Sequence, residues 1–160
     1  MHIGLEEYRA IKRISKRDAD YDTFRREALV LKELRHPGIP MIYDLEEDSE
    51  FFYLIEEYLE GYSLYALIAN QGPIQEAEAV RYGMQVCGLV AYMHSACEIP
   101  ILHLDLQPNN LIICNGTVKL IDFDHAAGCR WANIAPKRFG TVGCAAPEQY
   151  ASDRMLDQRT

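Results

Sequence analysis

The feature that most constrains this chain is a pair of polar clusters near its middle, at residues 103–110 (HLDLQPNN) and 121–124 (IDFD). Asp105 lies five positions before the amide Asn110, and a second acid, Asp122, follows a short apolar stretch. Pro108 opposes regular secondary structure between them, so this loop can direct its polar side chains into one cleft. Asp and Asn beside Pro also form ordinary turns, which leaves both interpretations open for these clusters alone.

A third motif, Ala146-Pro147-Glu148, follows the two clusters. In this order the three resemble the catalytic loop, the D-F-G motif and the A-P-E motif of the eukaryotic-type protein kinase family, Ser/Thr branch. Each motif alone is a weak signal, whereas all three in sequence rarely occur by chance. The resemblance implies an α+β two-lobe fold. It has a small antiparallel sheet with one helix in the N-lobe, and a mainly helical C-lobe with a short β hairpin.

The resemblance assigns a role to each polar residue. Phosphoryl transfer depends mainly on positioning and charge neutralisation. Asp105 would face the acceptor hydroxyl, while Asn110 and Asp122 would hold Mg²⁺, an ion that prefers oxygen ligands. The segment 8–14 (YRAIKRI) resembles the family's V-A-I-K strand, so Lys12 would bind the ATP phosphates and pair with Glu27 on the next helix.

The resemblance also implies an adenine pocket between the lobes. Backbone groups of Glu57 and Leu59 would hydrogen-bond the base, and Ala10 and Ile112 would enclose it. Taken alone, the chemistry of these four residues does not indicate a binding site, and only the downstream motifs give them this role.

Glu56 would form the back wall of that pocket, where an acid is unusual for the family. An ionised carboxylate is disfavoured in an apolar pocket unless a cation reaches it. We therefore hypothesise that Glu56 competes with Glu27 for Lys12.

Hydrophobic periodicity and turn residues predict the secondary structure that would carry these groups. The sequence predicts strands and helices in alternation, with Asn115-Gly116 as a two-residue hairpin turn. The predicted strands are 8–14, 41–45, 50–58, 111–114 and 118–121. The first predicted helix begins within residues 18–22 and ends at residue 35, and the other two run from 63 to 70 and from 75 to 96.

Three further positions and one segment depart from the family pattern. Leu104 replaces the arginine that receives an activating phosphate, and residues 125–140 contain no Ser, Thr or Tyr. We therefore expect a non-RD kinase that is active without phosphorylation of this segment. Gln107 replaces a lysine that steadies the γ-phosphate, and Asp124 replaces a glycine, which would restrict flipping of the motif.

Downstream, residues 140–143 (GTVG) resemble the segment that precedes A-P-E. Thr141 would contact Asp105 and help to form the acceptor platform, to which Glu148 also belongs. A phosphotransferase for small molecules shares the H-x-D-x-x-x-x-N pattern, but the segment GTVGCAAPE is not expected in that class.

Composition narrows the partners and the compartment. The net charge of −8 argues against nucleic acid and anionic membrane surfaces, both of which attract basic proteins. Five cysteines without any C-x-x-C indicate neither a zinc site nor a disulfide framework, which is typical of a reducing cytoplasm. The start of the sequence lacks the apolar region of a signal peptide.

The resemblance extends over nearly the whole sequence, but we expect the sequence to cover only the middle of the family's domain. No G-x-G-x-x-G precedes Lys12, and the family's later helices are absent after Glu148. We interpret residues 1–58 as an N-lobe remnant and residues 59–160 as a partial C-lobe.

Three functions remain open at this stage. The first is an ATP- and Mg²⁺-dependent Ser/Thr protein kinase acting on a protein substrate. The second is a pseudokinase that binds nucleotide as a scaffold, and the third is an inactive truncated fragment. The sequence does not indicate an oligomeric state.

Overall fold

The computed structural model describes residues 7–17, 21–128, 140–151 and 155–160. Within the first helix it leaves the side chains at positions 22, 23, 26 and 27 outside the description. Every statement below concerns the described residues.

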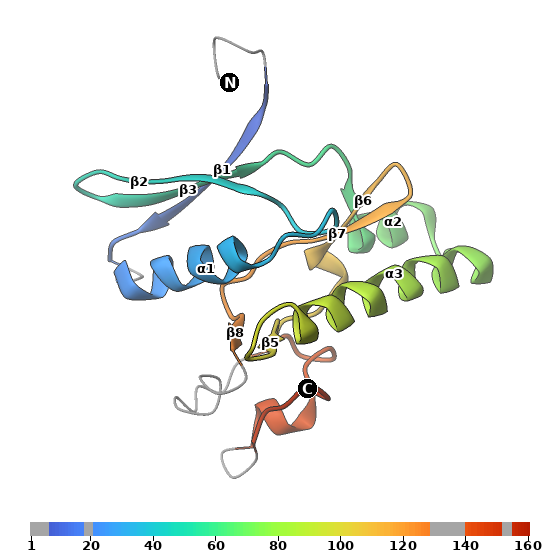
Figure 1. Ribbon diagram of the computed structural model, residues 1–160. Helices are drawn as coiled ribbons and strands as arrows, with labels where there is room; N and C mark the ends of the chain where they lie inside the picture. Colours follow the sequence, from blue (N-terminus) through green and yellow to red (C-terminus); the bar gives the residue numbers. More distant parts are fainter. Residues whose placement is uncertain (1–6, 18–20, 129–139, 152–154) are drawn as a thin grey trace.

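The upper layer in Figure 1 is a three-stranded antiparallel sheet with one helix beneath it. Its elements are β1 (Arg9–Ser15), α1 (Tyr21–Glu33), β2 (Ile42–Glu47) and β3 (Phe51–Glu57), and the strand order is β1-β3-β2. Phe24 of α1 stacks on Phe52 of β3 with ring centroids 4.9 Å apart. Both rings are buried, as is Leu54, so the helix covers the apolar face of the sheet.

The lower layer combines two helices with short strands. The strands form two small sheets, of order β4-β6-β7 and β5-β8. The elements are β4 (Tyr62–Ser63), α2 (Leu64–Gln71), α3 (Glu76–Ser95), β5 (Ile101–Leu102), β6 (Leu111–Cys114), β7 (Thr117–Leu120) and β8 (Ala127–Gly128), with the 3₁₀ turns η1 (Pro108–Asn110) and η2 (Pro147–Gln149).

Local sequence explains where these elements begin and end. Ser63 caps α2, because its hydroxyl accepts a hydrogen bond from the Ala66 N–H at 3.1 Å, and Gly72 ends the helix with φ 81°. Asn115 and Gly116 both have positive φ, at 48° and 78°, as a tight β6–β7 hairpin requires. The helices, strands and turn predicted from the sequence are confirmed within a few residues.

Burial is uneven along α3. Tyr82, Leu89 and Met93 are buried, whereas Ala79 and Gly83 are exposed. The helix therefore contacts the core mainly through its second half.

The segment after α1 joins the two layers. The Gly38 carbonyl accepts a hydrogen bond from the Leu120 N–H at 2.8 Å. A Cβ at position 38 would lie 2.5 Å from a methyl group of Leu89, so this close approach requires glycine. The Tyr92 hydroxyl of α3 bonds both the N–H and the carbonyl of Arg35, at 2.7 and 2.9 Å.

One apolar core runs through both layers. Leu31 and Phe123 are buried in it, and Ile42 packs against it. His103 meets the Phe123 ring edge-on, with centroids 4.8 Å apart. The arrangement agrees with the expected α+β two-lobe architecture, and no helix in the described ranges is long and apolar enough to span a membrane.

Candidate active site

The loop that carries Asp105 leaves β5 through an unusual backbone conformation. Leu104 has φ 66°, a left-handed value that is uncommon for a non-glycine residue. The buried His103 ring fixes the turn, since its Nδ1 accepts the Asp105 N–H at 3.3 Å while its Nε2 lies 3.2 Å from the Ile121 carbonyl. Both contacts are satisfied by one neutral tautomer with the proton on Nε2. The ring therefore connects the 103–110 loop to the 121–124 segment.

Three side chains hold the Asp105 carboxylate. Thr141 donates to Oδ1 at 2.7 Å, and Gln107 and Asn110 donate to Oδ2 at 2.7 and 3.0 Å. Partial burial raises the pKa of Asp105, but these hydrogen bonds outweigh that effect and hold its pKa below the usual value. The expected contact between Thr141 and Asp105 is present, and the carboxylate is ionised at neutral pH.

Asn110 lies beside the second acid. Its carbonyl accepts the Ile121 N–H at 2.9 Å, which places Asn110 next to the residue before Asp122. Its amide nitrogen is occupied by Asp105, so the amide oxygen faces the other way. That oxygen has no partner among the described residues, and no side-chain polar atom there is both buried and unpaired, so it reaches solvent.

The donor set fits Mg²⁺ better than a softer metal. One amide oxygen and the half-exposed carboxylate of Asp122 are hard oxygen ligands that leave coordination positions for phosphate and water. No cluster of three or more His, Cys, Asp or Glu able to hold a metal occurs in the described ranges. These residues are therefore compatible with a Mg²⁺ ion that binds together with a nucleotide.

Lys12 reaches this segment from β1. Its ammonium donates to Asp122 Oδ1 at 3.0 Å and also to Asp124 Oδ1. Glu27, the predicted partner of Lys12, lies on α1, but its side chain is outside the described part of the structure. The expected Lys12–Glu27 pair is therefore neither observed nor contradicted.

Glu56 stands beside Ala10 in the sheet register and near the Lys12 cluster. Burial raises the pKa of Glu56, Lys12 lowers it, and the carboxylates of Asp122 and Asp124 raise it further. The net shift is upward, as expected for an acid in this position. Among the described contacts of Lys12 are ion pairs with Asp122 and Asp124, and the hypothesis that Glu56 competes with Glu27 for Lys12 did not include Asp124. The competition itself stays a prediction.

The predicted adenine-binding residues Glu57 and Leu59 lie at the end of β3 and shortly after it. The Glu57 N–H already donates to the Met41 carbonyl at 2.9 Å, so this N–H is not available to a base. Its side chain forms an ion pair with Lys119 at 2.8 Å. Leu59 lies in the connection to β4, and Ile112 lies on β6, where it pairs with Ser63.

The departures from the family pattern have physical explanations. Leu104 is buried in a small cluster with Leu102 and Leu156, an environment that excludes an arginine. The Gln107 amide donates a hydrogen bond to Asp105. It thus stabilises the loop and does not act in place of a phosphate-binding lysine.

Positive φ occurs at Asp122, at 64°, and not at Asp124, so this conformation places no left-handed strain at position 124. The expectation that Asp124 restricts flipping of the motif stays a prediction. Most of the segment without Ser, Thr or Tyr, residues 129–139, lies outside the described residues.

Sequence reasoning missed two contacts. The buried Gln149 donates to the Leu104 carbonyl at 2.7 Å and accepts the Ala146 N–H at 3.0 Å, which joins η2 to the catalytic loop. Glu148 precedes it on η2. The contact of Asp124 with Lys12 was also missed, because nothing in the sequence indicates a pair separated by 112 positions.

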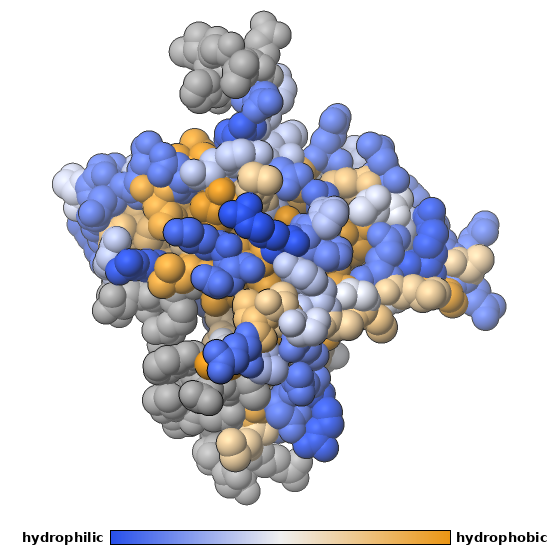
Figure 2. Space-filling model, viewed as in Figure 1, coloured by the Kyte–Doolittle hydropathy of each residue, from blue (hydrophilic) through white to orange (hydrophobic). Residues whose placement is uncertain are grey.

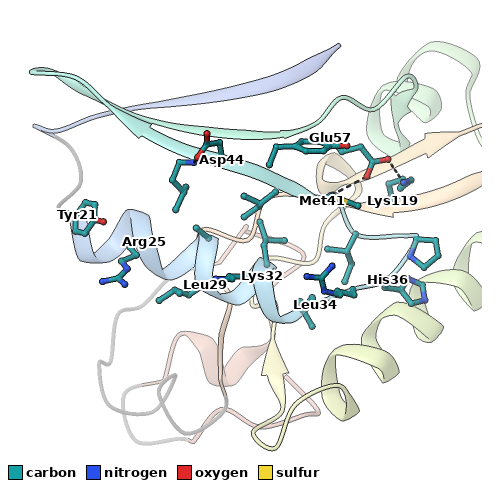
Figure 3. A pocket seen from close by; sticks show the side chains of 18 residues that line it. Tyr21, Arg25, Leu29, Lys32, Leu34, His36, Met41, Asp44, Glu57 and Lys119 are labelled. Carbon is teal, nitrogen blue, oxygen red and sulfur yellow. Dashed lines mark hydrogen bonds and ion pairs between the residues drawn. The ribbon is translucent and has the colours of Figure 1, made fainter. Parts of the chain in front are cut away.

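A groove of about 990 Å³ lies elsewhere, between α1 and β2. Figure 3 shows side chains of α1, among them Leu29 and Lys32, along one side of it and the Glu57–Lys119 ion pair at one end. In Figure 2, hydrophobic and hydrophilic side chains alternate over this face. Lys12, Asp105 and Asp122 do not line the groove, so it is separate from the acids described above.

Comparison with known proteins agrees with this geometry. The sequence profile described as "Protein kinase domain" matches residues 1–159. The chain therefore belongs to the protein kinase family.

Several curated kinases are similar to it. The serine/threonine-protein kinase PrkC of Bacillus subtilis is 35% identical over 129 residues, which is 79% of this chain and 19% of that protein. A probable serine/threonine-protein kinase, the KIN1 homolog of Enterocytozoon bieneusi, is 38% identical over 92% of this chain and 25% of its own length. The hormonally up-regulated neu tumor-associated kinase homolog of Xenopus tropicalis is 34% identical over 94% of this chain and 22% of its own length. The chain thus spans at most about a quarter of each of these relatives.

Proposed function

We propose that this chain is the central part of a Ser/Thr protein kinase, which transfers the γ-phosphate of ATP to a hydroxyl group of a protein with the help of Mg²⁺. The observation that carries the proposal is the Asp105 carboxylate. It is ionised, held by three donors and connected through Asn110 and His103 to the segment that bears Asp122. In this proposal residues 1–58 belong to the N-lobe and residues 59–160 to the C-lobe.

Asp105 accepts a hydrogen bond from the substrate hydroxyl and orients it toward the phosphate. A carboxylate of lowered pKa is a weak base, so its main contribution is alignment, with proton acceptance late in the transfer. Thr141 fixes one carboxylate oxygen and, with Glu148, belongs to the platform that receives the protein substrate.

The Asn110 amide oxygen and the Asp122 carboxylate hold Mg²⁺ in this proposal. A Mg²⁺ ion held by these two residues would neutralise charge that develops on the transferring phosphate. Lys12 contacts the phosphates, with Glu27 as its further partner. Support comes from the solvent-facing amide oxygen and from the position of Lys12 opposite Asp122.

The nucleotide base is assigned to the space between the sheet and β6. The Glu57 carbonyl and the Leu59 backbone bind its polar edge, Ala10 and Ile112 enclose its faces, and Glu56 lines the back.

Regulation in this proposal follows the non-RD pattern, without a phosphorylated side chain in residues 125–140. The surroundings of Leu104 support it, because the described members of its cluster are leucines, which cannot receive a phosphate. Its partner is a protein substrate and not nucleic acid or membrane, in accord with the charge of −8. Four described cysteines are free, which favours the cytoplasm.

A nucleotide-binding pseudokinase is the second candidate. The observation that favours it is the commitment of two polar groups to internal contacts. Gln107 donates a hydrogen bond to Asp105, and Lys12 is held by two carboxylates. The side chains of Gln107 and Lys12 must therefore leave these partners, or other groups must take their place, before phosphate can bind.

Transfer of ³²P from ATP to a generic basic protein separates these candidates. If the chain labels the acceptor, we expect Asp105→Asn to lose at least about 100-fold in rate. Glu98→Gln, which removes an exposed charge outside the motifs, serves as the matched control. Nucleotide binding without transfer would identify a pseudokinase, and absence of both would identify an inactive fragment.

A further inference from the structure

Two carboxylates share the ammonium of Lys12. Asp122 accepts from it at 3.0 Å, and Asp124 makes a shorter contact with the same nitrogen. The side chains are 26% exposed for Lys12 and 40% and 43% exposed for the two acids, so solvent and ligands can reach all three. Asp124 stands where the family pattern has glycine, which has no side chain, so the second carboxylate is a property of this sequence.

The backbone holds Asp124 in this position. Phe123, between the two acids, is fully buried against the His103 ring. Its carbonyl accepts the Ala126 N–H at 2.9 Å, which closes a turn directly after the motif. The left-handed conformation of Asp122 on one side and this turn on the other fix the directions of both acids.

Among the described residues, carboxylates outnumber the cation at this point. One ammonium contacts two carboxylates, before the nearby Glu56 is considered. A polyphosphate that approaches without a cation is repelled by this excess, and its oxygens must also replace Asp124 as partners of the ammonium. A divalent cation removes the repulsion, because it offsets the carboxylates and the phosphates together.

We propose that Asp124 is a specificity-determining residue that makes nucleotide binding depend on a divalent cation, by retaining Lys12 and by adding a negative charge beside the phosphate site. This inference rests on the proposed nucleotide site. It goes beyond that proposal, since a glycine at position 124 would leave Lys12 with one fewer carboxylate. A metal-free nucleotide would then not have to displace this carboxylate from the ammonium.

The test measures binding and not turnover. The whole chain and the variants Asp124→Gly and Asp124→Asn are titrated with fluorescent N-methylanthraniloyl-ATP, once in excess EDTA and once in excess Mg²⁺. The ratio of the two dissociation constants is compared among them. Asp124→Asn keeps the shape of the side chain and removes its charge, and Glu98→Gln changes the net charge equally at an exposed position.

We expect both Asp124 variants to bind the metal-free nucleotide about threefold to tenfold more tightly, so that the ratio shrinks, while Glu98→Gln leaves it unchanged. In a Lys12→Met background the effect of Asp124→Asn should be clearly smaller, because the retained ammonium is gone. If both Asp124 variants bind nucleotide and the ratio is unchanged, the inference is overturned while the proposed nucleotide site stands. Failure of every protein to bind nucleotide in either buffer overturns the proposed nucleotide site and this inference with it.

Discussion

Thr141 and Asp105, 36 positions apart, are joined by a hydrogen bond of 2.7 Å between the hydroxyl and one carboxylate oxygen. Two other side chains hold the second oxygen, so Thr141 alone fixes the first. The orientation of the carboxylate thus depends on a residue of the 140–143 segment.

Thr141→Ala should lower the rate of phosphate transfer by about tenfold, because a hydrogen bond to a charged group is lost and Asp105 gains rotational freedom. The kcat of the variant, measured at saturating ATP, checks this. Thr141→Ser retains the hydroxyl and should keep most of the activity; equal losses in the two variants would contradict a role for the hydroxyl.

Leu104→Arg restores the residue of the family pattern and should nevertheless destabilise the protein by about 2–4 kcal/mol, because it places a cation in an apolar cluster. The free energy of unfolding in urea measures the effect. Leu106→Arg is the matched control two positions away, where the side chain is exposed and a change within about 0.5 kcal/mol is expected. A stable Leu104→Arg protein would mean that the cluster opens readily.

Gln149→Glu separates the two contacts of this buried side chain. The carboxylate can still accept the Ala146 N–H, but it cannot donate to the Leu104 carbonyl and meets it with like charge. We expect a loss of about 1–3 kcal/mol in the free energy of unfolding and faster amide hydrogen exchange around Leu104 and Asp105. The substitution would have no such effect on exchange if η2 did not support the catalytic loop.

His103 should make the stability depend on pH below neutrality. Burial lowers its pKa; the Ile121 carbonyl and the carboxylates of Asp105 and Asp122 raise it, and His125 lowers it, with a net shift downward. The folded protein therefore resists protonation while the unfolded chain accepts a proton near pH 6.5. The free energy of unfolding should be insensitive to this group above that pH. Below it the free energy should fall, by at most about 1.4 kcal/mol per pH unit, until the folded-state pKa is reached.

Urea unfolding at pH 7.5 and pH 5.5 measures this dependence, with His103→Gln as the comparison. The glutamine variant should show the smaller decrease between the two pH values, whatever its absolute stability. The raised pKa of Glu56 acts in the opposite direction in both proteins, so the difference between them isolates His103. A larger decrease in the variant would show that the ring is protonated in the folded state.

Gly38→Ala should destabilise the junction of the two layers. A methyl group there would lie 2.5 Å from a Leu89 methyl and 3.1 Å from the Val118 carbonyl, so α3 or the β6–β7 hairpin must shift. We expect a loss of about 1–3 kcal/mol in the free energy of unfolding. Gly88→Ala, on the exposed face of α3 where a methyl meets no neighbour, should be neutral or slightly stabilising.

Elements with strong local signals could be predicted from the sequence. Ser63 and Gly72 mark the ends of α2 through capping, and Asn115-Gly116 fixes the hairpin through backbone conformation, so in both cases the cause is local. The hydrogen bond between Asn110 and Asp105 could also be predicted, because the resemblance supplied the spacing of a known loop. That their oxygens converge with Asp122 on one metal ion stays a prediction.

Contacts that depend on a rare backbone conformation or on distant pairs could not be predicted. Leucine at position 104 gives no signal for φ 66°, which arises because His103 and Gln149 fix the chain on both sides. The bond between Lys12 and Asp124 depends on the position of β1 above the 121–124 segment, a tertiary property that a local pattern does not contain.

The link between Tyr92 and Arg35 has a consequence for motion. The C-terminal end of α1 is tied to α3 by two hydrogen bonds and to β7 through Gly38, whereas its N-terminal end carries no such tie among the described residues. A displacement of α1 that alters the distance between Glu27 and Lys12 should therefore pivot near residue 35 and disturb the stacking of Phe24 on Phe52. An effector that acts by moving this helix would gain most leverage at its opposite end, around Tyr21.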